Sequence, residues 1–208
     1  MTQSGSTAGW NLVKFILDEI GIDYDYGFIP TDVNIDKKTE PPKLNINDFN
    51  KKRNNLSKPL VVKIHRKSYI EIKDSDLVIL SIRNLQQATI SGRKKGHWDS
   101  KKHIHNNIEI YNEWKDRSDH IIKFNNLVNN TDKVIDNVCS KLGIKLTKNQ
   151  KNNIVNKVKN IPTNDYKKYL LTSKHIQSKG TYHHDISLPN DILRELNNHK
   201  EKYKELFV

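Results

Sequence analysis

Residues 60–82, LVVKIHRKSYIEIKDSDLVILSI, decide the fold class because they hold two short runs rich in β-branched residues. The runs Leu60–Ile64 and Leu77–Ile82 are typical of strands covered on both faces, and we expect them to be neighbouring central strands. A weaker run at residues 120–124 predicts a further strand. Because helical patterns alternate with these runs, we expect an α/β fold, a three-layer domain with a mostly parallel central sheet flanked by helices.

Capping residues and apolar residues at helical spacing mark the expected helices. The first helix follows a turn of small residues and is closed by Gly21. Helices are expected over residues 10–20, 103–115, 134–142 and 147–158, and from Pro189 towards residue 206. Residues 23–59 are polar and contain several prolines, which indicates a long loop excursion. The chain of 208 residues is expected to form a single domain, 1–208.

The chain is strongly basic. It has 36 Lys and Arg residues against 24 Asp and Glu residues, a formal net charge of +12. Such a surface attracts phosphates, sulfates or nucleic acid, so the charge selects a class of partner and not a reaction.

Cysteine and membrane signals are sparse. The single cysteine, Cys139, excludes an intramolecular disulfide and the zinc sites built from two or four cysteines. His97, His103 and His105 have no carboxylate or thiolate at a recurring ligand spacing, so no metal site is expected. Without a long apolar stretch or a signal-like start, we expect a soluble, unprocessed, cytoplasmic protein with no membrane partner.

Polar residues stand at the ends of these elements, where α/β sheets hold ligands. Ser4-Gly5-Ser6-Thr7 precedes the first helix, and small residues there allow several backbone N–H groups to converge on an anion. Lys63 and His65 end the first strand, and Arg83 ends the second, with Ser91 eight positions later. Each piece also has an ordinary structural explanation, but together they favour a site for a phosphate-bearing ligand.

In this order the motifs resemble those of the sulfotransferase family, which takes a sulfuryl group from 3′-phosphoadenosine 5′-phosphosulfate. The family has a loop like Ser-Gly-Ser-Thr, a strand ending in Lys-x-His, and Arg-Asn followed by Ser at the eighth position after the Arg. Residues 122–128 and 142–144 look like a later strand motif and its Leu-Gly-Ile, and residues 178–180 look like the final basic-glycine element. The resemblance implies a P-loop-like nucleotide-binding core, this nucleotide as donor, and no metal.

The resemblance also implies a role for each matching residue. The donor would be held by the first loop at its phosphosulfate and by the other residues at its 3′-phosphate: Ser4, Gly5, Ser6 and Thr7, then Arg83, Ser91, Lys179 and Gly180. His65 would be the general base for an acceptor hydroxyl or, less often, an amine, on a small molecule or carbohydrate. Lys63 would neutralise charge on the leaving phosphate.

Several alternatives stay open at this stage. Gln3 stands where the family usually has a basic residue, so either Lys14, Lys63 or another cation substitutes for it or the reaction is slow. Arg83 could instead pair with Asp74 or Asp76, and His65 could be a structural histidine. The alternatives for the whole protein are a basic nucleic-acid-binding protein, although no motif of that class is visible, and a degenerate sulfotransferase that binds nucleotide but turns over poorly. Acceptor identity and oligomeric state cannot be predicted.

Overall fold

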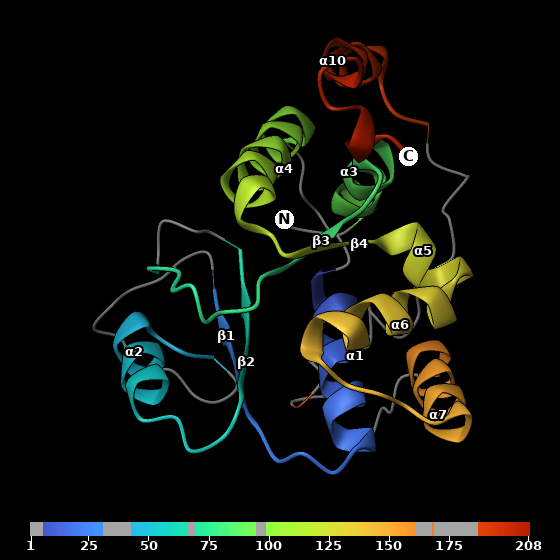
Figure 1. Ribbon diagram of the computed structural model, residues 1–208. Coiled ribbons are helices and arrows are strands. Elements are labelled where there is room, and N and C mark those ends of the chain that lie inside the picture. The colour runs from blue at the N-terminus through green and yellow to red at the C-terminus, as the bar shows by residue number, and fades with distance from the viewer. Residues whose placement is uncertain (1–5, 31–42, 66–69, 95–98, 161–167, 169–186) are drawn as a thin grey trace.

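The computed structural model describes residues 6–30, 43–65, 70–94, 99–160, 168 and 187–208. They form a mixed α/β structure with four short strands in two parallel pairs (Figure 1). Strand β1 (Asp25–Ile29) pairs with β2 (Leu60–Ile64), with Phe28 opposite Lys63. Strand β3 (Ile79–Ile82) pairs with β4 (His120–Lys123), with Ile82 opposite Lys123.

Helices make up most of the remaining described chain. The α-helices are α1 (Ser6–Glu19), α2 (Ile46–Asn54), α3 (Leu85–Lys94), α4 (Ser100–Trp114), α5 (Phe124–Asn129), α6 (Thr131–Leu142), α7 (Lys148–Lys159) and α10 (Asn190–Lys200). Two short 3-10 helices are η2 (Lys115–Arg117) and η3 (Lys204–Leu206). Among the described residues, no helix is both long and apolar enough to cross a membrane.

The helix ends expected from capping residues are confirmed. Gly21 follows α1 with φ 71°, and Gly143 ends α6 with φ 68°, a backbone conformation that side chains other than glycine rarely adopt. Thr147 caps α7 in a capping box with Gln150, in which each side chain accepts a hydrogen bond from the other residue's backbone. Pro189 stands at the N-terminal cap of α10.

The β3–β4 pair has helices on both faces, which is the layered arrangement of α/β proteins. Leu80 and Ile82 of β3 face a core shared with α4 and α10, whereas Ile79 packs against the core that α1 shares with α6 and α7. Figure 1 shows α3, α4 and α10 above this pair and α1, α6 and α7 below it. A third, smaller core lies between the β1–β2 pair and α2, around Ile29, Leu44 and Phe49.

Three expectations differ from the structure. The expected single central sheet is replaced, among the described residues, by two separate pairs, and β2 and β3 are not partners. The strand beside β2 is β1, which lies inside the expected loop of residues 23–59 together with α2. Residues 122–128, expected to resemble a strand motif, include the last two residues of β4 and then the helix α5.

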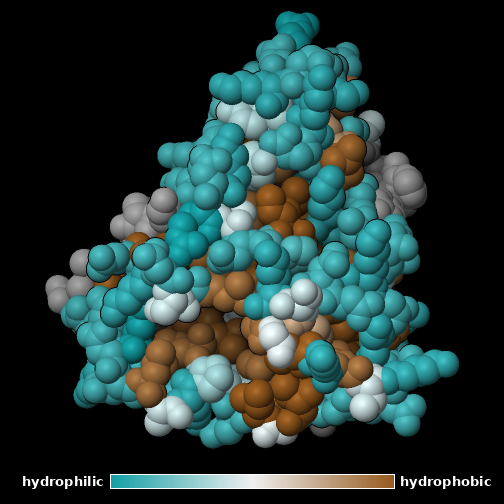
Figure 2. Space-filling view, in the orientation of Figure 1, coloured by the Kyte–Doolittle hydropathy of each residue, from teal (hydrophilic) through white to brown (hydrophobic). Residues whose placement is uncertain are grey.

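Helix α1 lies against both strand pairs. The Trp10 indole N–H donates to the Val61 carbonyl of β2 at 3.2 Å. One residue earlier, a methyl group at Gly9 would lie 2.1 Å from Ser81 Oγ of β3, so only glycine permits this approach without a shift. Figure 2, in the same orientation, shows the largest group of hydrophobic residues in the lower half of this face, over the region of β2 and α1, and a smaller group near its middle.

Candidate functional site

The predicted loop and the first predicted strand meet at one hydrogen bond. The Lys63 ammonium donates to Thr7 Oγ1 at 2.8 Å. Thr7 lies in the first turn of α1, and Lys63 is the last residue but one of β2. Because Trp10 also bonds to Val61, the first turn of α1 is fixed beside the carboxyl end of β2.

This end of α1 favours negatively charged ligands. The first four backbone N–H groups of a helix have no partner within the helix, and its dipole places partial positive charge there. The first turn contains no acidic residue. The Lys63 ammonium adds a full positive charge at the same place, so both contributions attract an anion.

The Phe28 ring of β1 contacts both Lys63 and His65. The Lys63 ammonium lies 4.9 Å from the centre of the Phe28 ring, and the His65 ring meets the same ring edge-on at 5.8 Å between centroids. The backbone carbonyl of His65 accepts a hydrogen bond of 3.0 Å from the Trp114 indole at the end of α4. His65 is only 7% exposed, so its imidazole is largely shielded from solvent.

Lys14, the other nearby lysine considered as a replacement for the cation missing at Gln3, has a different place. It is fully buried, with its ammonium 3.4 Å from the centre of the Trp10 ring and 4.9 Å from that of Tyr26. The same ammonium donates to the Lys168 carbonyl. Lys14 follows Thr7 by about two turns, roughly 10 Å along the helix. Of the two lysines named, Lys63 is therefore the one at the start of α1.

Arg83 lies at the end of the other strand pair, and Ser91 lies on the helix that follows it. Arg83 directly follows β3, and its guanidinium carbon lies 4.9 Å from the centre of the Phe124 ring, which directly follows β4. Ser91 is half-buried on α3. Asp76, considered as a partner of Arg83, forms an ion pair with Arg53 instead. Arg83 therefore occupies the carboxyl end of a parallel pair, where ligands bind in α/β proteins.

Part of the predicted site lies outside the described residues. Ser4 and Gly5 of the first loop, with Gln3 before them, precede the described part of the chain, and Lys179 and Gly180 fall in the range 169–186. Ser6 is described as the first residue of α1.

The aromatic residues of the site were not found from the sequence. Phe28 lies in the segment expected to be a loop, and Phe124 follows a strand as the first residue of a helix. The run Asp25–Ile29 does carry a signal, since Tyr26, Phe28 and Ile29 have strong β propensity and Pro30 follows them.

A cleft along β1 contains none of the predicted site residues. It has a volume of about 440 Å³ and is lined mainly by residues of α2 and of the segment after it, together with Asp25 and Lys43. Lys52 donates a hydrogen bond of 2.8 Å to Asp25, which holds the pKa of this carboxyl below its usual value, and Lys58 lies 3.2 Å from the other oxygen. The positive charge of the cleft is thus partly neutralised.

Comparison with known proteins gives no relative: no protein-family model matches the chain, and no curated protein matches it.

Proposed function

We propose that this protein is a sulfotransferase that moves a sulfuryl group from 3′-phosphoadenosine 5′-phosphosulfate to a hydroxyl group, or less often an amine, of a small molecule or carbohydrate. The observation that carries the proposal is the 2.8 Å hydrogen bond from Lys63 to Thr7 at the start of α1. It joins the two motifs that the resemblance assigns to the phosphosulfate. The P-loop-like core implied by the resemblance is part of the same proposal.

The donor would bind through two groups of residues. Its phosphosulfate would accept hydrogen bonds from the first-turn amides of α1, from Thr7 Oγ1 and from the Lys63 ammonium. Its 3′-phosphate would lie against Arg83 and Ser91, since a planar guanidinium and a short hydroxyl suit an anion with several oxygens. The strong basic charge of the chain favours a ligand that is anionic at both ends.

The reaction requires one nucleophilic attack and one proton transfer. The acceptor oxygen bonds to sulfur while the bond from sulfur to the bridging phosphate oxygen breaks. The hydroxyl proton passes to a ring nitrogen of His65, and adenosine 3′,5′-bisphosphate leaves. Lys63 stabilises the negative charge that develops on the leaving phosphate. His65 and Lys63 both contact the Phe28 ring, which supports assigning the base and the cation to one site.

Binding of the product nucleotide tests the donor site. Adenosine 3′,5′-bisphosphate at about 100 times its Kd should stabilise the fold by roughly 2.7 kcal/mol, a rise in Tm of roughly 5 °C or more. Lys63→Met and Arg83→Ala should each reduce or abolish this shift. Lys43→Met is the matched control. Lys43 has the same charge as Lys63, and its backbone forms a β-bridge with Phe28 on the edge of β1 opposite to β2. If neither 3′-phosphoadenosine 5′-phosphosulfate nor adenosine 3′,5′-bisphosphate raises Tm at millimolar concentration, the proposal is wrong.

Turnover is tested separately, with radiolabelled donor and a panel of hydroxyl and amine acceptors. The wild type should transfer sulfate, and His65→Ala should lose transfer while keeping the nucleotide-induced rise in Tm. Nucleotide binding without transfer by the wild type to any acceptor would instead identify a degenerate sulfotransferase.

A further inference from the structure

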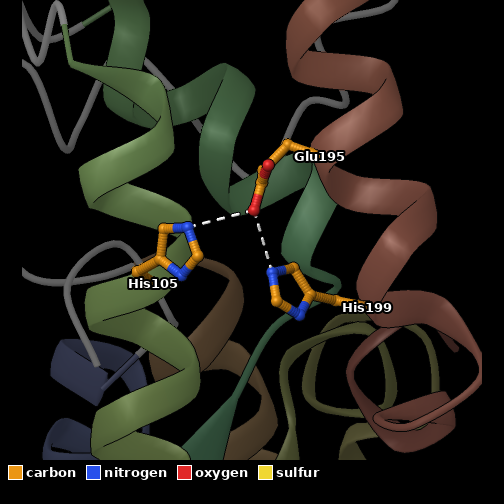
Figure 3. Close-up of side chains that lie close together, drawn as sticks. All are labelled: His105, Glu195 and His199. Carbon is orange, nitrogen blue, oxygen red and sulfur yellow. Dashed lines mark hydrogen bonds and ion pairs between the residues drawn. The ribbon is translucent and has the colours of Figure 1, made fainter.

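Two histidines and a glutamate meet between α4 and α10, away from the residues proposed for sulfuryl transfer. Glu195 Oε1 lies 3.0 Å from His105 Nε2 and 3.0 Å from His199 Nε2. One ligand atom from each of the three residues lies within 4.8 Å of the other two. Figure 3 shows His105 reaching from α4 towards Glu195 and His199, which come from successive turns of α10.

The three residues belong to a row of polar contacts between α4 and α10, which run in the same direction. Lys101 forms an ion pair of 3.5 Å with Asp191, one turn before His105 and Glu195. After His199, the Asn112 amide of α4 donates to the Tyr203 hydroxyl at 3.1 Å. Residues spaced by four share one face of a helix, so the backbones of both helices hold the three ligand groups together.

The spacing of the three groups fits a small divalent transition metal. A tetrahedral ion with bonds of about 2.1 Å places its ligand atoms roughly 3.4 Å apart. Two of the separations are 3.0 Å, and all three ligand atoms lie within 4.8 Å of one another, a range that includes this value. Two imidazoles and one carboxylate form a donor set typical of Zn²⁺.

Exposure and charge also favour a metal. His105 has a side chain 58% exposed, which leaves a path from solvent, whereas Glu195 and His199 are 21% and 22% exposed. Neutral imidazoles contribute no charge, so Glu195 alone offsets part of the charge of a divalent ion. Three protein ligands would leave a fourth position for water.

We propose that His105, Glu195 and His199 bind a divalent transition metal of the Zn²⁺ type, which fastens the C-terminal helix to α4. The binding site is independent of the proposed sulfuryl transfer. Its effect would be structural, because the metal would join two helices that already share an apolar core through Ile104, Ile108, Ile192 and Leu196.

The test uses the full chain without a histidine tag, stripped of metal and titrated with Zn²⁺ against a chromophoric zinc indicator. Changes in the outer-shell partners of metal ligands alone weaken metal binding roughly 10–100-fold, so removing a ligand should weaken it at least as much. We expect this loss in His199→Ala and Glu195→Gln, and a Zn²⁺-induced rise in Tm in the wild type alone. His105→Ala is the variant least able to disturb folding, because its side chain is largely exposed.

Lys101→Ala is the matched control, because it removes an ion pair between the same two helices and leaves all three ligands in place. Its zinc affinity should stay within about twofold of the wild type. Equal zinc affinity in the wild type and in His105→Ala, His199→Ala and Glu195→Gln would overturn the proposal and assign binding to other histidines of the chain. Zinc binding that Mg²⁺ reverses at equal concentration would also overturn it, because Mg²⁺ prefers oxygen ligands.

Discussion

Lys14 is a buried cation whose partners are aromatic rings and a backbone carbonyl. Its ammonium lies over the Trp10 ring at 3.4 Å and donates to the Lys168 carbonyl. Burial of a charge is unfavourable unless the charge has such partners, and a desolvated cation–π contact is worth about 2 kcal/mol. The same Trp10 bonds to Val61, so Lys14 supports the residue that fixes α1 beside β2.

Replacing Lys14 therefore tests this contact. Lys14→Met keeps a long side chain and removes the charge, and it should lower the free energy of unfolding by about 1–2 kcal/mol. The measurement is urea denaturation followed by circular dichroism. Lys133→Met, at an exposed position of α6, is the control and should change stability by less than about 0.5 kcal/mol. A Lys14→Met variant as stable as the wild type would mean that the cation adds nothing.

The candidate site was predictable from sequence where it follows from local pattern. Polar residues at the end of a β-branched run indicate a strand end, and this placed Lys63 among the last two residues of β2 and Arg83 directly after β3. Phe28 could not be placed in the same way, because its contact with Lys63 depends on which strand pairs with β2. The cluster of His105, Glu195 and His199 could not be predicted either, because His105 is far from the other two residues in the sequence and no local spacing relates α4 to α10.

Among the elements, η3 is fixed to α4 by a charged hydrogen bond. The Tyr111 hydroxyl donates to Glu205 Oε1, and this bond holds the pKa of the Glu205 carboxyl below its ordinary value of 4.5. Burial, followed by the same bond, raises the pKa of Tyr111. The bond thus favours an ionised glutamate and a protonated tyrosine, and each preference predicts a pH range in which stability is lost.

The sign of the pH effect follows from these shifts. Because the pKa of Glu205 is lower in the folded protein, its contribution is complete above pH 4.5 and is lost as the pH falls through the folded value. The raised pKa of Tyr111 predicts a second loss as the pH rises above 10. Tyr111→Phe should lower the free energy of unfolding at pH 7 by about 1–2 kcal/mol and by less at pH 3.5.

Urea denaturation at the two pH values measures this difference. Asn112→Ala is the control, because it removes a neighbouring neutral hydrogen bond to Tyr203. Its effect should be nearly the same at both pH values. Equal losses for Tyr111→Phe at pH 7 and pH 3.5 would show that the ionisation of Glu205 does not contribute.

Element prediction succeeded where caps and periodicity coincide, as in α6 and α7, whose ends were located by Gly143 and Thr147. It failed for β1 and α2. Strand β1 carries β propensity at Tyr26, Phe28 and Ile29, but Gly27 interrupts the run, and α2 buries only Phe49. Strand β1 depends on pairing with β2, which is distant in sequence. Helix α2 packs through Phe49 against Ile29 and Leu44, and Leu44 lies outside both elements.

At the scale of the whole molecule, helix α1 connects the two strand pairs, which in the described part of the chain are not joined by a common strand. The β1–β2 and β3–β4 pairs share no strand among the described residues, yet α1 touches both, through Thr7 and Trp10 on one side and Gly9 on the other. The proposed donor site also divides between the two pairs, with Lys63 on β2 and Arg83 after β3. The packing of α1 on β3 therefore contributes to the placement of the two parts of that proposed site.

A double-mutant cycle tests this packing. A methyl group at residue 9 would lie 2.1 Å from Ser81 Oγ but 3.4 Å from Ser81 Cβ, so only the hydroxyl is in severe conflict with it. Gly9→Ala should destabilise the fold by about 1–3 kcal/mol in the wild-type background. In the Ser81→Ala background the same change should be neutral or stabilising, because alanine has a helix propensity about 1 kcal/mol better than glycine. A coupling energy near zero from urea denaturation would mean that Ser81 moves aside freely, and that α1 does not fix the spacing of the two strand pairs.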